Sequence, residues 1–166
     1  MSSYTSLAYH AIFSTKHRHP SIGEDFRRRL HEYIGGIIRN KKGSPIEING
    51  IADHVHVLAQ FPASVAVSEM LRDIKANSSG WVNELALVRG RFEWQVGFAA
   101  FTVSFSTIPS VREYIVNQEE HHRIHTFEEE YIAFLDRHEI KYERSQLFEK
   151  EFAGCMNVSP HSRLGV

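Results

Sequence analysis

The stretch Gly-Ile-Ala-Asp-His-Val-His-Val-Leu-Ala-Gln, residues 50–60, predicts the β-strand around which the rest of the fold can be arranged. Successive strand side chains point to opposite faces of a sheet, so His54 and His56 share one face and the two valines of the run take the other. Two imidazoles on a rigid strand can bind a metal ion. The spacing alone is weak evidence, because a chain with 11 His among 166 residues is expected to contain about one His-x-His pair by chance.

A second pair, His17-Arg18-His19, shows how little the spacing means by itself. It lies outside any apolar pattern and next to Lys16, and the neighbouring cations would repel a divalent ion. We expect this pair to contact solvent or phosphate. The pair at 54 and 56 lies instead in an apolar run, where an unpartnered imidazole is costly to bury. It needs either a metal ion or hydrogen-bond partners, and both alternatives remain open at this point.

Apolar periodicity predicts the order of strands and helices. Four stretches have the alternation and the aromatic and β-branched content of strands: residues 6–14, 46–48, 54–61 and 98–106. Helical spacing predicts one helix that ends near Asn40 and a second that begins near Ser64. The order β-α-β-β-α-β predicts an α+β fold, the ferredoxin-like antiparallel sheet with helices on one face, followed by C-terminal helices.

Three Ser/Thr-x-x-Glu sequences have the form of a capping box and predict the starts of helices. They begin at Ser21, Ser110 and Thr126. The helix from Ser110 would carry Tyr114 in its first turn, with Gln118 four residues further on the same face. The helix from Thr126 is expected to run to about His138.

Size and composition indicate one domain with a core, since 166 residues with 42% hydrophobic content are typical of a folded globular protein. We expect the domain to span residues 1–152 and residues 153–166 to form a flexible tail. The single cysteine, Cys155, excludes an intramolecular disulfide and a Cys-rich zinc site. There is no apolar run of about 18 residues and no signal-peptide pattern, so we expect a cytoplasmic protein without a membrane partner.

The net charge of -1 conceals a division along the chain. Residues 1–50 carry eight Lys/Arg against four acidic residues, a net of +4, and residues 101–166 carry seven against eleven, a net of -4. A basic half permits a nucleic-acid face on a neutral protein, because counterion release depends on local phosphate contacts. Solvated helix faces explain the run Arg27-Arg28-Arg29 equally well.

Tyr114 and Gln118 offer chemistry that would complement the histidine pair if their helix lies against it. A phenol is a potential nucleophile, and an amide oxygen is a hard metal ligand. A mixed set of nitrogen and oxygen ligands suits Mg²⁺ or Mn²⁺ better than it suits a thiolate-based zinc site.

These motifs together resemble a known family, the single-tyrosine HUH transposases of the smallest insertion sequences with their REP-associated relatives. The likeness covers roughly residues 4–150 in unbroken order. The matching pieces are Tyr9–Lys16, Asp53–Leu58, Trp94–Phe98 and Tyr114–Gln118, followed by His121-His122 and Thr126–Glu129.

The resemblance implies a role for each matched position. His54, His56 and Gln118 correspond to the metal ligands, and Tyr114 corresponds to the nucleophile. The family cleaves and rejoins single-stranded DNA at hairpin-marked sites through a 5′-phosphotyrosine intermediate, with Mg²⁺ or Mn²⁺ and without a nucleotide cofactor. It typically works as a homodimer in which the tyrosine helix of one subunit completes the other's site. The sequence leaves open whether Tyr114 acts in cis or in trans.

Physical chemistry is consistent with these roles. A phenol with a pKa of about 10 is a poor nucleophile at neutral pH, and a nearby cation favours its ionised form. A place in the first turn of a helix would add a favourable dipole. Candidate phosphate contacts are Arg27, Arg28, Arg29, Lys41 and Lys42.

Other side chains are expected to have structural or solvent-exposed roles. Trp94 is expected to pack, Lys75 to be solvated, and His121 and His122 to lie on a helix surface.

The alternative function is a catalytically inactive or domesticated module that only binds hairpin DNA. A sheet that binds RNA through exposed aromatics is disfavoured, because the third strand carries histidines in place of the Arg/Lys-Gly-Phe-x-Phe signature. A two-histidine phosphoesterase would need two His-x-Thr/Ser pairs, which the chain lacks.

Overall fold

Four strands form one antiparallel sheet in the computed structural model, which describes residues 4–148. They are β1 (Ala8–Ser14), β2 (Ser44–Gly50), β3 (His54–Gln60) and β4 (Ala99–Val103), in the order β2-β3-β1-β4. This order confirms the ferredoxin-like arrangement. The predicted domain end at residue 152 and the predicted tail over 153–166 lie outside the described residues.

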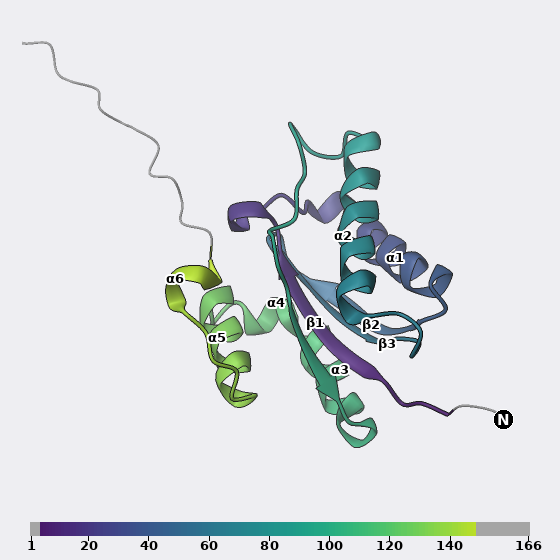
Figure 1. Cartoon of the computed structure of the whole chain (residues 1–166). Helices are drawn as coiled ribbons and strands as arrows, with labels where there is room; N and C mark the ends of the chain where they lie inside the picture. The colour runs from purple at the N-terminus through teal and green to yellow at the C-terminus, as the bar shows by residue number, and fades with distance from the viewer. Residues whose placement is uncertain (1–3, 149–166) are drawn as a thin grey trace, which may run out of the picture.

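Helices cover both faces of the sheet (Figure 1). The long helices α1 (Glu24–Asn40) and α2 (Val67–Glu84) lie on one face. The shorter helices lie on the other side: α3 (Ile108–Val116), α4 (Gln118–His121), α5 (Phe127–Arg137) and α6 (Arg144–Leu147). The 3₁₀ turns η1 (Lys16–Arg18) and η2 (Phe105–Thr107) follow β1 and β4. Among the described residues, no helix is both long enough and apolar enough to span a membrane.

The face under α1 and α2 is an apolar core. Val55 and Val57 of β3 are fully buried there, together with Leu30 and Ile34 of α1 and Leu71 of α2. The predicted alternation is therefore confirmed, since the valines point into this core and the histidines between them point away from it.

The opposite face carries a smaller apolar cluster around the histidines. Ile12 of β1 packs with Phe101 of β4 and with Phe127 and Leu135 of α5. Ile12 is paired in register with His56, which places the histidine at the centre of this face.

The hairpin between β2 and β3 sets where the histidine strand begins. A Cβ atom at Gly50 would lie 2.2 Å from the carbonyl oxygen of His54, so only glycine fits this close approach. Residues 51–53 form the turn between the two strands. Asp53 is thereby placed directly before His54.

Two of the three predicted capping boxes are wrong. Gly23 is the N-cap of α1 and no side chain caps that helix, so Ser21 has no such role. Helix α3 begins at Ile108, and Pro109 lies in its first turn. The fixed φ of proline favours this place at the start of a helix. Tyr114 therefore lies near the C-terminal end of α3, where the expected N-terminal dipole does not act.

The third capping box is confirmed at Thr126, where the Thr126 hydroxyl and the Glu129 carboxylate each bond the other's backbone N–H. The predicted strand 98–106 is too long, because β4 ends at Val103 and Phe105 is 78% exposed in η2. Helix α2 begins at Val67, three residues later than predicted.

The segment between α2 and β4 is held in place by side chains from α2. Trp94 is buried, as predicted, and its Nε1 donates to Ser78 Oγ at 2.9 Å. Lys75 is not simply solvated, because its Nζ donates to the carbonyl oxygen of Gly97 at 2.6 Å.

Candidate metal and nucleophile site

Both histidines of β3 are fully buried, and each is held by a neighbour through Nδ1. His54 Nδ1 lies 2.7 Å from Asp53 Oδ1, and His56 Nδ1 lies 2.9 Å from Nε2 of His10 on β1. A contact at Nδ1 fixes the ring and directs Nε2 elsewhere, which is typical of metal-binding histidines. Among the described residues, His56 Nε2 has no hydrogen-bond partner.

The His10–His56 contact determines which nitrogen of His56 can bind a cation. Burial, and then the nearby His56, lowers the pKa of His10 to about 3. Burial also lowers the pKa of His56 to about 4, although Glu130 acts in the opposite direction. Both rings are therefore neutral at pH 7 and share one N–H. When His56 Nδ1 donates to His10, His56 Nε2 presents a lone pair to the site.

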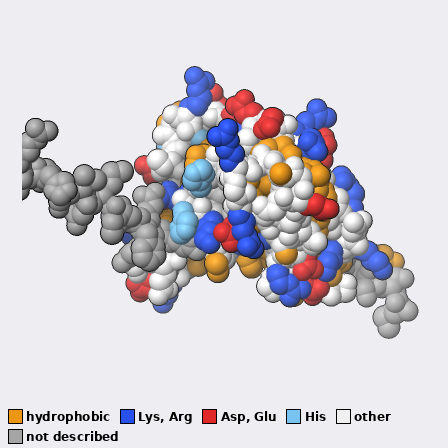
Figure 2. All heavy atoms as spheres, turned by 90° about the horizontal axis from the view of Figure 1, so that it is seen from above, with side chains coloured by type: hydrophobic (Ala, Val, Ile, Leu, Met, Phe, Trp, Pro, Cys, Tyr) orange, Lys and Arg blue, Asp and Glu red, His pale blue; other side chains and the backbone are white. Residues whose placement is uncertain are grey.

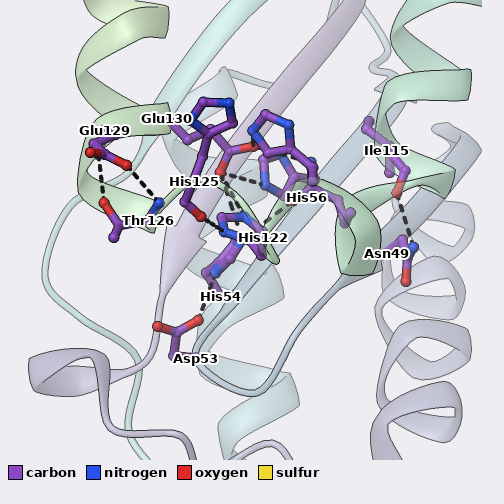
Figure 3. A network of polar contacts seen from close by, with 12 residues as sticks. Asn49, Asp53, His54, His56, Ile115, His122, His125, Thr126, Glu129 and Glu130 are labelled. Carbon is purple, nitrogen blue, oxygen red and sulfur yellow. Dashed lines mark hydrogen bonds and ion pairs between the residues drawn. The ribbon is translucent and has the colours of Figure 1, made fainter.

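Glu130 of α5 places a carboxylate among these imidazoles (Figure 3). Its Oε2 lies 3.1 Å from His122 Nε2, 3.4 Å from His56 Nε2 and 3.8 Å from His54 Nε2. One ligand atom from each of these four residues lies within 4.8 Å of the others. Glu130 is in the first turn of α5, so the capping box at Thr126 fixes its position.

Gln118 and Tyr114 meet the same carboxylate. Gln118 is fully buried, with Oε1 3.5 Å from His54 Nε2 and Nε2 donating to Glu130 Oε1 at 3.1 Å. The Tyr114 hydroxyl also donates to Glu130 Oε1. The structure thus brings together His54, His56, Gln118 and Tyr114, the four site residues identified in the sequence.

A side chain of β2 ties the break between α3 and α4 to the sheet. Asn49 Nδ2 donates to the carbonyl oxygens of Ile115 and Val116, at 2.9 and 3.1 Å. These contacts hold the end of the tyrosine helix beside β3, as Figure 3 shows for Ile115.

The charges in the cluster depend on one another. Burial alone would raise the pKa of Glu130, but the hydrogen bond from His122 and the nearby His56 ring outweigh it, and the pKa is lowered. Burial would lower the pKa of His122, yet its contact with Glu130 raises it. Burial and the Glu130 charge raise the pKa of Tyr114, so its phenol is neutral at pH 7.

The donor set fits a divalent cation. It combines imidazole nitrogens with a carboxylate and an amide oxygen, and the carboxylate supplies the negative charge that a cation requires. The unpartnered, buried Nε2 of His56 is the observation that favours this fit, because such an atom is costly to bury without a partner.

Two residues of this cluster were missed by the sequence analysis. His122 was expected on a helix surface, but its side chain is 6% exposed. Glu130 was not identified, although a signal was present: it interrupts the apolar stripe of α5 between Phe127 and Phe134. A carboxylate on the buried stripe of a helix is uncommon without a partner. The pair at His17 and His19 lies at η1, outside the cluster.

The five predicted phosphate contacts do not form one group. Arg27 and Arg28 line a groove of about 700 Å³ between α1 and β2, together with Arg39. Arg29 lies over the Trp81 ring, and Lys41 is ion-paired with Glu69 and Asp73. Figure 2 shows Lys and Arg side chains interleaved with Asp and Glu over the face it presents.

The sequence model of the family described as "Transposase IS200 like" matches residues 3–118. The transposase of insertion sequence element IS200 from Salmonella typhimurium is 27% identical over 115 residues, which cover 66% of this chain and 75% of that protein.

Two solved structures have a similar fold. One is a Deinococcus radiodurans R1 protein described as a transposase, with 22% identity and a TM-score of 0.57 over 71% of this chain and 95% of that chain. The other is a REP-associated tyrosine transposase bound to a REP hairpin, with 16% identity and a TM-score of 0.56 over 74% of each chain. These likenesses agree with the α+β fold described above.

The resemblance seen in the motifs is therefore confirmed by the family match, which spans more than half of the chain. The cluster of three histidines and a glutamate is consistent with divalent-metal binding in such a protein. The chain belongs to the IS200-like transposase family and is a DNA-cleaving transposase.

Proposed function

We propose that this transposase cleaves and rejoins single-stranded DNA at hairpin-marked sites through a 5′-phosphotyrosine intermediate, with Tyr114 as the nucleophile. One observation carries the proposal. The Tyr114 hydroxyl meets, in one chain, the same buried carboxylate that His56 and His122 contact. We call His54, His56, His122 and Glu130 the metal-type cluster. A phenol with a purely structural role does not require such a cluster at its hydroxyl.

The candidate ligands are His54, His56, His122 and Glu130, with Gln118 as the further ligand expected from the family. A bound cation would supply Lewis-acid polarisation of a phosphodiester oxygen and would favour the ionised phenol. Of the two ions expected, Mn²⁺ suits the site better, because Mg²⁺ prefers oxygen ligands and water to several imidazoles.

The cleavage step exchanges one phosphodiester bond for another. Tyr114 Oη forms a bond to phosphorus while the bond from phosphorus to the 3′ oxygen breaks. The phenol loses a proton and the departing 3′ oxygen gains one, so the 5′-phosphotyrosine retains the bond energy and no nucleotide cofactor is needed. Attack by another 3′-hydroxyl reverses the step. Glu130 holds the Tyr114 oxygen in place, and the partial burial of Tyr114 limits competing attack by water.

The DNA hairpin is proposed as the partner from the similar structure that was solved with a REP hairpin. Of the five phosphate candidates, Arg27 and Arg28 share a groove with Arg39, where Arg27 pairs with Glu119 and Arg28 with Glu32. Arg29, Lys41 and Lys42 remain candidates outside this groove. Since the substrate is DNA, we also propose that the protein acts in the cytoplasm.

A homodimer is expected from the family, and we retain it as a proposal. The described residues place Tyr114 beside the histidines of its own chain, with ring centroids of His56 and Tyr114 6.1 Å apart. This geometry supports action in cis, so that a second subunit is not required to complete the site. Light scattering of the purified protein tests the dimer itself.

The competing function is an inactive module that only binds hairpin DNA. The test is to incubate the protein with labelled single-stranded DNA and Mn²⁺ and to separate the products on a denaturing gel. We expect a labelled covalent adduct that disappears in EDTA and in Tyr114→Phe, while hairpin binding by Tyr114→Phe survives. An adduct that persists in Tyr114→Phe would refute the nucleophile. Binding without any adduct in the wild type would favour the inactive module.

A further inference from the structure

A groove of about 440 Å³ opens beside Tyr114, between α3 and α5. Its walls include Val111 and Tyr114 from α3 and Ala133, Phe134 and Arg137 from α5. The lining residues of α5 recur at the spacing of one helix face. The groove therefore runs along α5, with Glu130 and the metal-type cluster at one end and Arg137 at the other.

The middle of the groove offers an aromatic surface. The ring of Phe134 meets His10 and Tyr114 edge-on, with centroids 5.1 and 5.6 Å apart. Bases of single-stranded nucleic acids stack on such side chains whatever their sequence. A volume of this size holds a small ligand, which corresponds to a short piece of single strand and excludes a duplex.

The far end of the groove carries a cation that pairs with no carboxylate among the described residues. Arg137 is exposed and forms no ion pair or hydrogen bond with any residue between 4 and 148. Two other exposed arginines, Arg112 in α3 and Arg123 after α4, do form ion pairs. Arg112 pairs with Glu47, and Arg123 pairs with Glu120. Helix α5 rises about 10 Å over the seven residues from Glu130 to Arg137. A phosphate held by Arg137 is thus a neighbour of the scissile one and is not the scissile phosphate itself.

We propose that the groove between α3 and α5 binds the single-stranded DNA beside the cleavage site, with Arg137 on a backbone phosphate and Phe134 against a base. The proposal rests on the function proposed above and adds where the strand lies. Arg137 is a positioning residue, because it acts on the strand and not on the reacting atoms.

The experiment measures binding without chemistry. Fluorescence anisotropy with a labelled single-stranded oligothymidine, in EDTA and in the Tyr114→Phe background, gives the affinity as a function of salt. We expect Arg137→Gln to weaken binding several-fold and to reduce the slope of log K against log salt by about 0.7, the value for one phosphate contact on a single strand. Arg137→Lys should restore the slope.

Two controls decide the outcome. Arg89→Gln removes another exposed arginine without a described ion pair, and it should change neither the affinity nor the slope. Phe134→Leu keeps much of the packing but should weaken binding about tenfold through lost stacking. An unchanged slope in Arg137→Gln, or an equal loss in binding to a blunt hairpin without a single-stranded flank, overturns the proposal. If the wild type forms no adduct with DNA, the proposed function fails, whatever the Arg137 result.

Discussion

The two faces of the sheet differ in what they bury. Under α1 and α2, the strands contribute Val55, Val57 and other apolar side chains to a core. On the other face, the same strands contribute His10, His54 and His56, all buried beneath α3, α4 and α5. Alternation along one strand therefore separates stability from chemistry: one face lowers the free energy of the fold, and the other holds groups that are costly to bury.

The polar face tolerates this burial because its side chains satisfy one another. Asp53 orients His54, His10 orients His56, and Glu130 receives the remaining donors. A network of this kind is sensitive to the loss of one member, since a partner is then left unsatisfied. Substitutions on the two faces should consequently have different signatures.

The largest expected effect is on the polar face. His56→Ala should reduce adduct formation by a factor on the order of 10³ or more, because a metal ligand is lost. Its melting temperature should fall only slightly, since the histidine contributes little to the apolar core. A gel assay with labelled single-stranded DNA and Mn²⁺, beside a thermal melt, checks both. A variant with full activity would remove His56 from the site.

The matched change on the apolar face should have the opposite profile. Ile34→Ala truncates a fully buried side chain of α1 and should lower the free energy of unfolding by about 3 kcal/mol. The folded fraction should keep its adduct yield. Urea denaturation gives the stability, and the gel assay at low temperature gives the yield. A selective loss of activity in the folded protein would mean that the two faces are not separable.

Glu130→Gln tests the residue that joins both parts of the polar face. We expect the affinity for Mn²⁺ to fall about 10- to 100-fold, because the negative charge beside three imidazoles is removed. Isothermal titration calorimetry measures this without DNA. Glu128→Gln on the same helix, where the carboxylate pairs with Arg18, is the control and should leave the affinity unchanged. Equal affinities for Glu130→Gln and wild type would exclude Glu130 as a ligand.

The smallest expected effect concerns His31 of α1, away from both clusters. Burial, and then Arg27, lowers the pKa of His31 to about 4. The unfolded chain binds this proton near pH 6.5 and the folded protein binds it only near pH 4. Stability is therefore present above about pH 6.5 and is lost as the pH falls between these values, by about 2 kcal/mol from pH 7.5 to pH 5.

Urea denaturation in EDTA at pH 7.5 and pH 5 measures this loss. Between these two pH values, His31→Gln should lose less free energy of unfolding than the wild type. If both lose the same stability between these pH values, the titration of His31 does not contribute.

Local chemistry made much of this fold predictable. The alternation at residues 54–57 gave the correct faces, and the Thr126 box gave the correct start of α5. The boxes at Ser21 and Ser110 were wrong because a stronger local feature competes with each. Gly23 takes the cap of α1, and Pro109 begins α3. The Ile108-Pro109 pair itself favours a helix start at this position, because Pro is common in the first turn of a helix.

The candidate site was only partly predictable for a different reason. His54, His56, Gln118 and Tyr114 were identified by spacing and family likeness, and they do meet. The parts that were missed, His122 and Glu130, depend on how the turn after α4 folds α5 back over the sheet. No periodicity in the sequence encodes that turn, so only the polar interruption of an apolar stripe at Glu130 pointed to it.

The central claim is that one chain holds both the metal-type cluster and its nucleophile. The most direct test combines two variants that each lack one part. His56→Ala and Tyr114→Phe are co-expressed with different tags, the mixed complexes are purified through both tags, and adduct formation with labelled single-stranded DNA is compared with that of wild type. If no doubly tagged complex forms, the two purified variants are mixed and assayed together. We expect no adduct, because no chain in the mixture carries a complete site. An adduct restored in the mixture would show that Tyr114 acts on the cluster of another subunit and would contradict the account.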